Sequence, residues 1–226
     1  MNKKHLKILS FILLIYIFFS SLNSFANSSP EYEFRGVWVA TVTNIDWPSK
    51  PGLSTDALKK EALDIINIHH SLGMNTIILQ IRPSGDAIYP TKLAPWSKYL
   101  TGQQGFNTEE NVDLLKFWID ECHKRNMELH AWINPFRASL HSDDSLHYTH
   151  PAYIHPQWTV KYNNKLYYNP GLPEVRQHII DVIADIVERY DINGIHIDDY
   201  FYPYPVNGET FNDSEPLYPN WIMKNH

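Results

Sequence analysis

The stretch from Pro173 to Asp198 reads PEVRQHIIDVIADIVERYDINGIHID. Its apolar residues first recur every three or four positions, which predicts a helix from Pro173 to about Tyr190 with one buried face. After a short return, Asp191 to Asn193, the apolar residues alternate and predict a strand from Gly194 to Asp198. A helix, a short return and a buried strand form the repeating unit of an α/β fold.

The chain before this stretch contains more of the same elements. Strands are predicted at Phe34 to Val42, Thr76 to Arg82 and Glu128 to Asn134, and helices at about Thr55 to Leu72 and about Glu109 to Arg125. Strands that alternate with helices pair in parallel through right-handed crossovers. The sequence therefore predicts an α/β fold with a parallel sheet.

The connections favour one α/β architecture over the other. A doubly wound sheet usually has a glycine-rich turn after its first strand, but the segment from Thr41 to Trp47 contains no glycine. Every predicted strand is followed by a long polar or aromatic loop, whereas every helix is followed by a short return. That asymmetry is typical of a (β/α)8 TIM barrel, whose active site lies at the carboxyl ends of the strands.

The length limits how much of a barrel the chain contains. The strand of the fourth β/α unit ends at Asp198, the chain has 226 residues, and a full barrel of eight units has about 250. We therefore interpret residues 27–226 as the N-terminal half of a TIM barrel. Because an open half-barrel exposes strand edges, the expected partner is the missing C-terminal half or a second copy through self-association.

The N-terminus has the pattern of a secretory signal peptide over residues 1–26. Lysines precede an apolar run from Ile8 to Phe19, and Ser24-Phe25-Ala26 supplies small residues before the expected cut. The run is shorter than the roughly 18 residues of a membrane span, so no stable membrane anchor is expected. No cysteine for lipid attachment lies near the cut. The mature protein is therefore predicted to be secreted or periplasmic.

Composition excludes some functions. Lysine and arginine total 19 against 25 acidic residues, a formal net charge of −6, which argues against a nucleic-acid partner. Aromatic residues make up 14% of the chain and many fall in predicted loops, where rings stack on ligands. The single Cys122 lies in a helical pattern and is interpreted as a core thiol.

The end of the last strand carries the candidate chemistry. Alternation places His196 and Asp198 on one face, and Asp198 at the carboxyl rim, where barrel enzymes hold catalytic carboxylates. Asp198 is thus the predicted catalytic carboxylate, against the alternatives of a helix cap or an ion pair. Asp199, the adjacent carboxylate and second catalytic candidate, points the other way if the strand continues, so the two aspartates are poorly placed for a glycosidase acid/base pair. A ligand contact of Asp199 and capping of the next loop are equally supported.

Further candidates come from the other strand ends and from the aromatic residues. Arg82 and Asn134 lie at the carboxyl ends of their strands, and alternation along each strand places them on the same face as Asp198. There they would bind sugar hydroxyls. The alternative for each is a structural role, in a salt bridge at the rim or in a turn at the strand end. Rings beside a polar rim suit sugars, although many are expected only to hold loops together. The predicted sugar-contacting residues are Arg82, Asn134, His196, Trp38, Trp47, Trp96, Tyr200 and Tyr202.

A metal site is considered and not favoured. His130, His196 and Asp198 could act as ligands, but no second histidine motif with ligand spacing accompanies them. Neither a metal nor another cofactor is predicted.

Seven blocks, in order along the mature chain up to Pro203, carry a resemblance. They are Phe34 to Ala40 (FRGVWVA), Asn44 to Ser49 (NIDWPS), Gln80 to Tyr89 (QIRPSGDAIY), Pro95 to Gly102 (PWSKYLTG), Ala131 to Pro135 (AWINP), Asn169 to Arg176 (NPGLPEVR) and Gly194 to Pro203 (GIHIDDYFYP). Together they resemble the glycosyl-hydrolase-like 10 family.

The resemblance implies a secreted or envelope-associated bacterial TIM-barrel glycosidase that acts on cell-wall polysaccharide, with peptidoglycan glycan strands as the substrate class. It also implies a catalytic role for Asp198, because related barrels place an aspartate nucleophile or stabiliser at the end of the fourth strand. The second catalytic carboxylate is then expected on a later strand. One departure is Asn193, where the family usually has aspartate. The alternative functions are a catalytically inactive glycan-binding protein or truncated barrel, and a metal-dependent barrel hydrolase.

Overall fold

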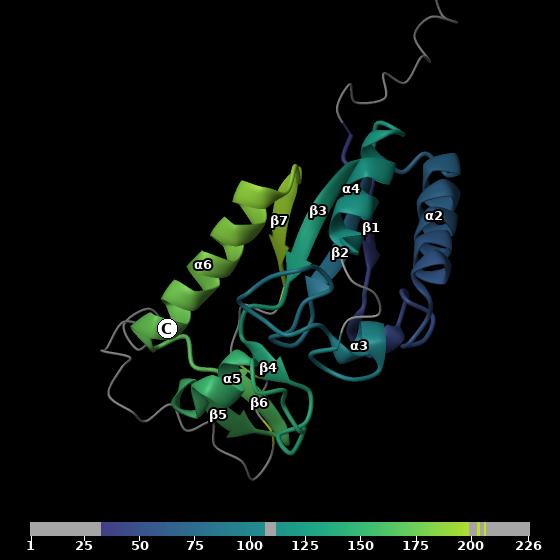
Figure 1. Cartoon of the computed structure of the whole chain (residues 1–226). Coiled ribbons are helices and arrows are strands. Elements are labelled where there is room, and N and C mark those ends of the chain that lie inside the picture. The colour runs from purple at the N-terminus through teal and green to yellow at the C-terminus, as the bar shows by residue number, and fades with distance from the viewer. Residues whose placement is uncertain (1–32, 107–111, 199–202, 204–205, 207–226) are drawn as a thin grey trace, which may run out of the picture. The chain divides into compact units, whose positions relative to one another are not determined.

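Four parallel strands form the main sheet of this protein. The computed structural model describes residues 33–106, 112–198, 203 and 206. The strands β1 (Gly36–Val39), β2 (Thr76–Arg82), β3 (Glu128–Ile133) and β7 (Gly194–Ile197) are all parallel and lie side by side in that order (Figure 1). All belong to one unit that begins at Arg35. The predicted signal peptide, residues 1–26, lies outside the described residues.

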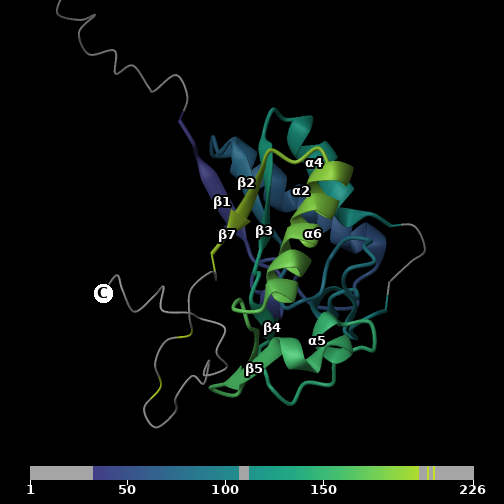
Figure 2. The ribbon, with the colours of Figure 1, turned by 90° about the vertical axis from the view of Figure 1, so that its left-hand side faces the viewer.

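Three long helices cover one face of this sheet. They are α2 (Thr55–Ser71), α4 (Leu114–His123) and α6 (Pro173–Arg189), and Figure 2 shows all three on the same side of the strands. Four parallel strands that alternate with three helices in this arrangement fit part of a (β/α)8 barrel, which confirms the predicted fold class. Strands and helices begin and end within a few residues of the predicted bounds where these are described.

The helices begin where the sequence supplies caps. The Ser54 side chain accepts a hydrogen bond from the Ala57 N–H at the start of α2, and the Asp113 side chain accepts one from the Lys116 N–H at the start of α4. Pro173 occupies the first turn of α6, where its missing N–H costs nothing. None of the helices in the described part of the chain is long and apolar enough to cross a membrane.

The main core lies between the helices and the sheet. Outward-facing strand residues such as Ile77, Leu79 and Leu129 pack with Leu58 of α2, and further members come from α4 and α6. Cys122 of α4 is fully buried in this core, and burial raises the pKa of its thiol to about 12. That environment agrees with the interpretation of Cys122 as a core thiol.

The opposite face of the sheet carries the polar and aromatic residues. Trp38 of β1 pairs in register with Ile78 of β2, and Gln80, Trp132 and His196 are aligned across β2, β3 and β7. In a (β/α) barrel the face without helices is the barrel interior. The side chains on this face therefore point into the barrel interior, and those at the carboxyl ends of the strands lie where barrel enzymes have their active site.

A second, antiparallel sheet follows β3, in a region predicted to be one long loop. Its strands β4 (Arg137–Ser139), β5 (Thr159–Tyr162) and β6 (Lys165–Tyr168) are arranged in the order β4-β6-β5. The β5–β6 hairpin turns at Asn163 and Asn164, whose φ angles of 47° and 55° suit a tight two-residue turn. Short helical segments complete the loop regions: η2 (Val42–Asn44), α3 (Lys98–Thr101), α5 (Pro151–Ile154) and η3 (Pro156–Trp158).

Gly85 is required where the loop after β2 meets the second sheet. Its φ is +67°, and a Cβ atom there would lie 2.7 Å from both His150 Nε2 and Tyr168 Oη. Gly73 has a similar φ of +79° with nothing within 4 Å of its Cβ position. Gly73→Ala is expected to lower the free energy of unfolding by about 1 kcal/mol through backbone strain alone. Gly85→Ala should cost about 1–2 kcal/mol more, measured by urea unfolding; equal costs would contradict the close packing around Gly85.

Candidate active site

Asp198 follows β7 and is held by two side chains from β3 and the residue after it. Asn134 Nδ2 donates a hydrogen bond to Asp198 Oδ1 at 2.6 Å, and Trp132 Nε1 donates to the same oxygen at 2.8 Å. The Trp132 indole can only donate a hydrogen bond, so Oδ1 must accept it. The predicted proximity of Asn134 and Asp198 is therefore found in the structure, and Trp132 joins them as a contact that the sequence analysis did not single out.

Trp38 lies beside this carboxylate support on the interior face of the sheet. Its ring packs edge to face against Trp132, with centroids 4.6 Å apart, and against His196, with centroids 4.3 Å apart. Trp38 keeps 43% of its surface exposed, whereas Trp132 keeps 7%. Two predicted sugar-contacting residues, Trp38 and His196, are thus brought together.

Arg82 is placed differently from the prediction. The pairing register between β2 and β3 shifts between Gln80 and Arg82, so strict alternation from Gln80 does not hold at the end of β2. The Arg82 side chain is 1% exposed, and its Nη2 lies 3.1 Å from Nε2 of His178 in α6. Arg82 therefore joins the strand end to α6, and the expectation that it lies on the rim face beside Asp198 is corrected.

Trp47 belongs to the core. It is 0% exposed, its ring meets that of Trp118 edge to face at 5.3 Å, and its Nε1 donates to the Leu58 carbonyl at 3.1 Å. A fully enclosed ring cannot stack on a sugar, so the predicted sugar contact of Trp47 is wrong. Trp96 is half-buried and packs against the same core. The backbone of Trp96 forms an isolated parallel β-bridge with Ala87, which stabilises the loop after β2.

The remaining predicted site residues lie outside the described part of the chain. These are Asp199, Tyr200 and Tyr202. Within the residues that are described, no group of three or more histidine, cysteine or acidic side chains gathers as a metal site would.

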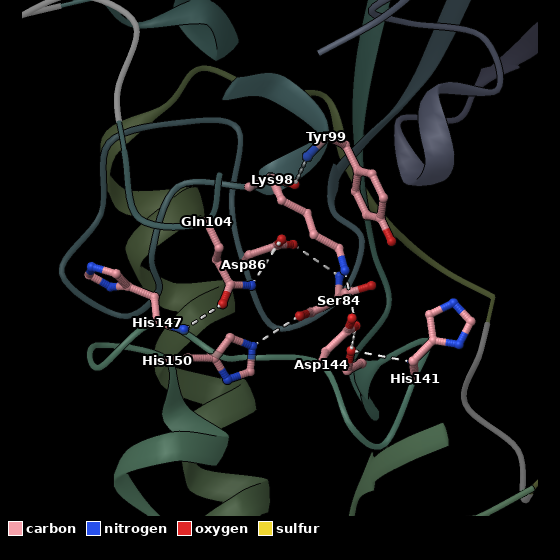
Figure 3. Close-up of polar contacts among 11 residues, drawn as sticks. Ser84, Asp86, Lys98, Tyr99, Gln104, His141, Asp144, His147 and His150 are labelled. Carbon is pink, nitrogen blue, oxygen red and sulfur yellow. Dashed lines mark hydrogen bonds and ion pairs between the residues drawn. The ribbon is translucent and has the colours of Figure 1, made fainter. Parts of the chain in front are cut away.

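A buried polar layer connects the loop after β2 with the second sheet. Asp86 is fully buried and accepts a hydrogen bond from the Ser84 N–H at 3.2 Å and one from Gln104 Nε2 at 3.4 Å. Burial raises the pKa of Asp86, while its hydrogen bonds oppose that shift. Figure 3 shows Asp86 and the His150 ring reaching the Ser84 backbone from two sides. This layer holds the loop above the strand ends.

His150 is confined to its neutral form by its neighbours. Its Nδ1 accepts the Ala152 N–H at 3.1 Å, and its Nε2 lies 3.1 Å from the Ser84 carbonyl, which only accepts. Protonation of Nδ1 would therefore set a proton against the Ala152 N–H. Burial lowers the pKa of His150 to about 4. Burial likewise lowers the pKa of His178, beside Arg82, to about 4.

These lowered pKa values predict loss of stability in acid. Because the unfolded chain binds a proton near pH 6.5 and the folded His150 only near pH 4, stability falls as the pH drops through that range. His150→Asn keeps an N-cap acceptor for α5 without the titration. Between pH 7 and 5 the wild type should lose about 2 kcal/mol more than this variant, measured by urea unfolding. His70→Asn, at an exposed position on α2, is the control; an equal loss in wild type and His150→Asn would contradict the burial of a neutral ring.

The chain is similar in sequence to a known family and to curated proteins. The family described as Glycosyl hydrolase-like 10 matches residues 33–221. Glycosyl hydrolase YngK of Bacillus subtilis (strain 168) is 47% identical over 203 residues, which cover 89% of this chain and 39% of YngK. Glycosyl hydrolase DigH of Escherichia coli (strain K12) is 35% identical over 198 residues, covering 80% of this chain and 44% of DigH. The chain thus spans less than half the length of these curated relatives.

Solved structures with a similar chain path include two sugar-cleaving enzymes. Alpha-L-fucosidase isoenzyme 2 from Paenibacillus thiaminolyticus gives a TM-score of 0.48 at 16% identity, over 74% of this chain and 23% of the fucosidase. The GH20 exo beta-N-acetylglucosaminidase from Vibrio harveyi gives a TM-score of 0.46 at 16% identity, over 75% of this chain and 27% of the glucosaminidase. Because the family match spans nearly all described residues and YngK shares 47% of the aligned ones, this chain belongs to the Glycosyl hydrolase-like 10 family.

Proposed function

We propose that the protein hydrolyses glycosidic bonds in bacterial cell-wall polysaccharide, with peptidoglycan glycan strands as its substrate class. The observation that carries this proposal is the Asp198 carboxylate at the end of β7, held by Asn134 and Trp132 beside the exposed ring of Trp38. Membership of a glycosyl hydrolase-like family supports the reaction class. The two curated relatives carry the name glycosyl hydrolase.

The proposed role of Asp198 follows from the transition state of glycoside cleavage. The anomeric carbon gains positive charge as the leaving oxygen departs, so a carboxylate fixed beside that carbon stabilises it or attacks it. Hydrogen bonds from Asn134 and Trp132 fix one carboxylate oxygen in place, and a fixed charge needs little reorganisation during the reaction. Trp38 would stack on the apolar face of a sugar ring, with the His196 ring against its edge.

A glycosidase also needs a second carboxyl group that protonates the leaving oxygen or activates water. Side chains adjacent on a strand point to opposite faces, so the proposed second carboxyl group lies on a further strand of the barrel and Asp199 is proposed to contact the sugar. The distance between the two carboxyl groups would decide between retention and inversion: about 5 Å for a retaining enzyme and 6.5–9.5 Å for an inverting one.

The remaining parts of the proposal concern location and partners. The signal-peptide pattern of residues 1–26 supports export to the periplasm or the medium. The proposed partner is the glycan itself, and the net charge of −6 argues against nucleic acid. The rest of a barrel, or a second copy of the chain, is proposed to close the sheet edges.

Hydrolysis of purified glycan tests the proposal. The full gene product that carries this chain is incubated with peptidoglycan glycan strands freed of peptides, and new reducing ends are counted, with starch and cellulose as comparison polymers. Release of reducing ends from the glycan strands alone is the expected result. Binding of the strands in a pull-down without any release would instead identify a glycan-binding protein and contradict the proposed enzyme.

A further inference from the structure

We propose that Gln80 is a positioning residue for Asp198, acting through the side chain of Asn134. This inference rests on the proposed function, because it assigns a role in the same site. Gln80 lies on β2, is 0% exposed, and faces the interior side of the sheet in register with Trp132. A fully buried amide on a barrel wall needs hydrogen-bond partners for its oxygen and its nitrogen, and here those partners lead to the carboxylate.

The oxygen of Gln80 is bound to the chain after β1. Its Oε1 accepts the Thr41 N–H at 2.9 Å and the Val42 N–H at 2.8 Å. The Thr41 hydroxyl in turn lies 3.0 Å from the Gln80 carbonyl, to which it donates. These contacts attach the Gln80 backbone and side chain to the carboxyl end of β1.

The nitrogen of Gln80 is directed at Asn134. Gln80 Nε2 donates to Asn134 Oδ1 at 2.5 Å, and Asn134 Nδ2 donates to Asp198 Oδ1 at 2.6 Å. Asn134 is 1% exposed. The amide groups therefore form a continuous series from the backbone after β1, through β2 and the end of β3, to the carboxylate after β7.

The Thr41 and Val42 N–H groups fix the direction of every hydrogen bond in this series. Backbone N–H groups can only donate, so the atom of Gln80 that faces Thr41 and Val42 must be the oxygen. The Gln80 nitrogen then faces Asn134 and can only donate, so Asn134 presents its oxygen to Gln80 and its NH2 group to Asp198. Gln80 thus decides that Asp198 faces a donor and not a second acceptor.

Gln80→Glu reverses this arrangement at constant size. A carboxylate at position 80 still accepts from the Thr41 and Val42 N–H groups but offers only an acceptor to Asn134. The Asn134 amide is then drawn to turn its NH2 group toward position 80 and its oxygen toward Asp198, where two acceptors repel. Asp198 then loses the Asn134 donor and keeps only that of Trp132, so its carboxylate is held less firmly without any change to Asp198 or to the sugar-contacting rings.

The variant is therefore expected to lower kcat for glycan hydrolysis by about 10-fold to 100-fold in the full gene product, as for a small misplacement of a catalytic group. KM should stay within about threefold, because Trp38 and His196 are untouched. A loss that appears in KM alone would contradict a positioning role. So would a kcat within about twofold of the wild type.

Gln104→Glu is the matched control. Gln104 also joins a backbone N–H, that of His147, to a carboxylate, that of Asp86, but in the loop layer and outside this series. Its replacement should leave kcat unchanged while it affects stability to a similar degree. If Gln80→Glu fails to fold, Gln80→Met removes the donor to Asn134 together with the acceptor of the Thr41 and Val42 N–H groups, without adding charge. A smaller kcat loss is expected, because Asn134 loses its support while no acceptor at position 80 turns its amide.

A second readout separates this inference from the proposed function. Crystal structures of the wild type and Gln80→Glu would be compared for the Asn134 to Asp198 distance. Lengthening beyond hydrogen-bond range supports the positioning role even if no glycan is cleaved by the wild type, a result that would overturn only the proposed function. An unchanged contact, with hydrolysis intact in both proteins, would overturn the role of Gln80 and leave the proposed function standing.

Discussion

Asp198→Asn is expected to lower kcat for glycan hydrolysis about 1000-fold while the protein remains folded. The asparagine oxygen can still accept from Asn134 and Trp132, which reach Asp198 Oδ1 at 2.6 and 2.8 Å, so the local packing survives. What disappears is the negative charge beside the anomeric carbon, and preorganised charge of this kind supplies a large part of enzymatic rate enhancement. The measurement is initial rates of reducing-end release by the full gene product.

The control for this experiment is Asp120→Asn. Asp120 lies on α4, where it forms an exposed ion pair with Lys116 at 2.9 Å, and exposed pairs of this type contribute little. Its replacement should change neither kcat nor the thermal unfolding temperature appreciably. Hydrolysis by Asp198→Asn within about tenfold of the wild type would contradict the assignment of Asp198 as the catalytic carboxylate.

Trp47→Ala is expected to lower the free energy of unfolding by about 3–5 kcal/mol, because it empties a large site in the main core. The ring is 0% exposed, packs against Trp118 and donates to the Leu58 carbonyl. The loss combines the transfer energy of the ring with the cavity that remains. Urea unfolding followed by circular dichroism measures it.

Trp38→Ala provides the comparison that separates packing from binding. Trp38 keeps 43% of its surface exposed, so its removal should cost only about 1 kcal/mol of stability. It should weaken binding of glycan oligomers about tenfold, the loss expected for one stacked ring. If Trp38→Ala destabilises the protein as much as Trp47→Ala and leaves binding unchanged, the assignment of Trp38 to the sugar-binding face is wrong.

The repeating pattern of strands and helices was readable from the sequence because its period is regular. Alternation along the strands placed Asn134 and Asp198 on one face, and the structure brings them within 2.6 Å. The same reasoning failed for Arg82, because the register shift after Gln80 breaks the alternation and hydrophobic periodicity does not encode a bulge. The role of Gln80 depends on amide hydrogen bonds between three strand ends, which a sequence pattern does not show.

The surroundings of the aromatic residues were the least predictable part of the site. Trp47, in the loop after β1, is enclosed by α2 and α4, whereas Trp38 lies on β1 and remains exposed on the face without helices. The burial of a loop residue such as Trp47 depends on which helices pack over the loop, and a sequence pattern does not determine this. The β5–β6 hairpin did leave a local signal, since Asn163-Asn164 between two runs rich in β-formers is typical of a tight turn.

A crystal structure of the full gene product carrying Asp198→Asn with a bound glycan-strand oligomer would test the catalytic role of Asp198 directly. We expect a sugar ring on the exposed face of Trp38, with its anomeric carbon within about 3.5 Å of the residue 198 side chain, as a reactive geometry requires. An oligomer bound elsewhere on the protein, with residue 198 remote from every anomeric carbon, would contradict the claim that Asp198 acts on the glycosidic bond.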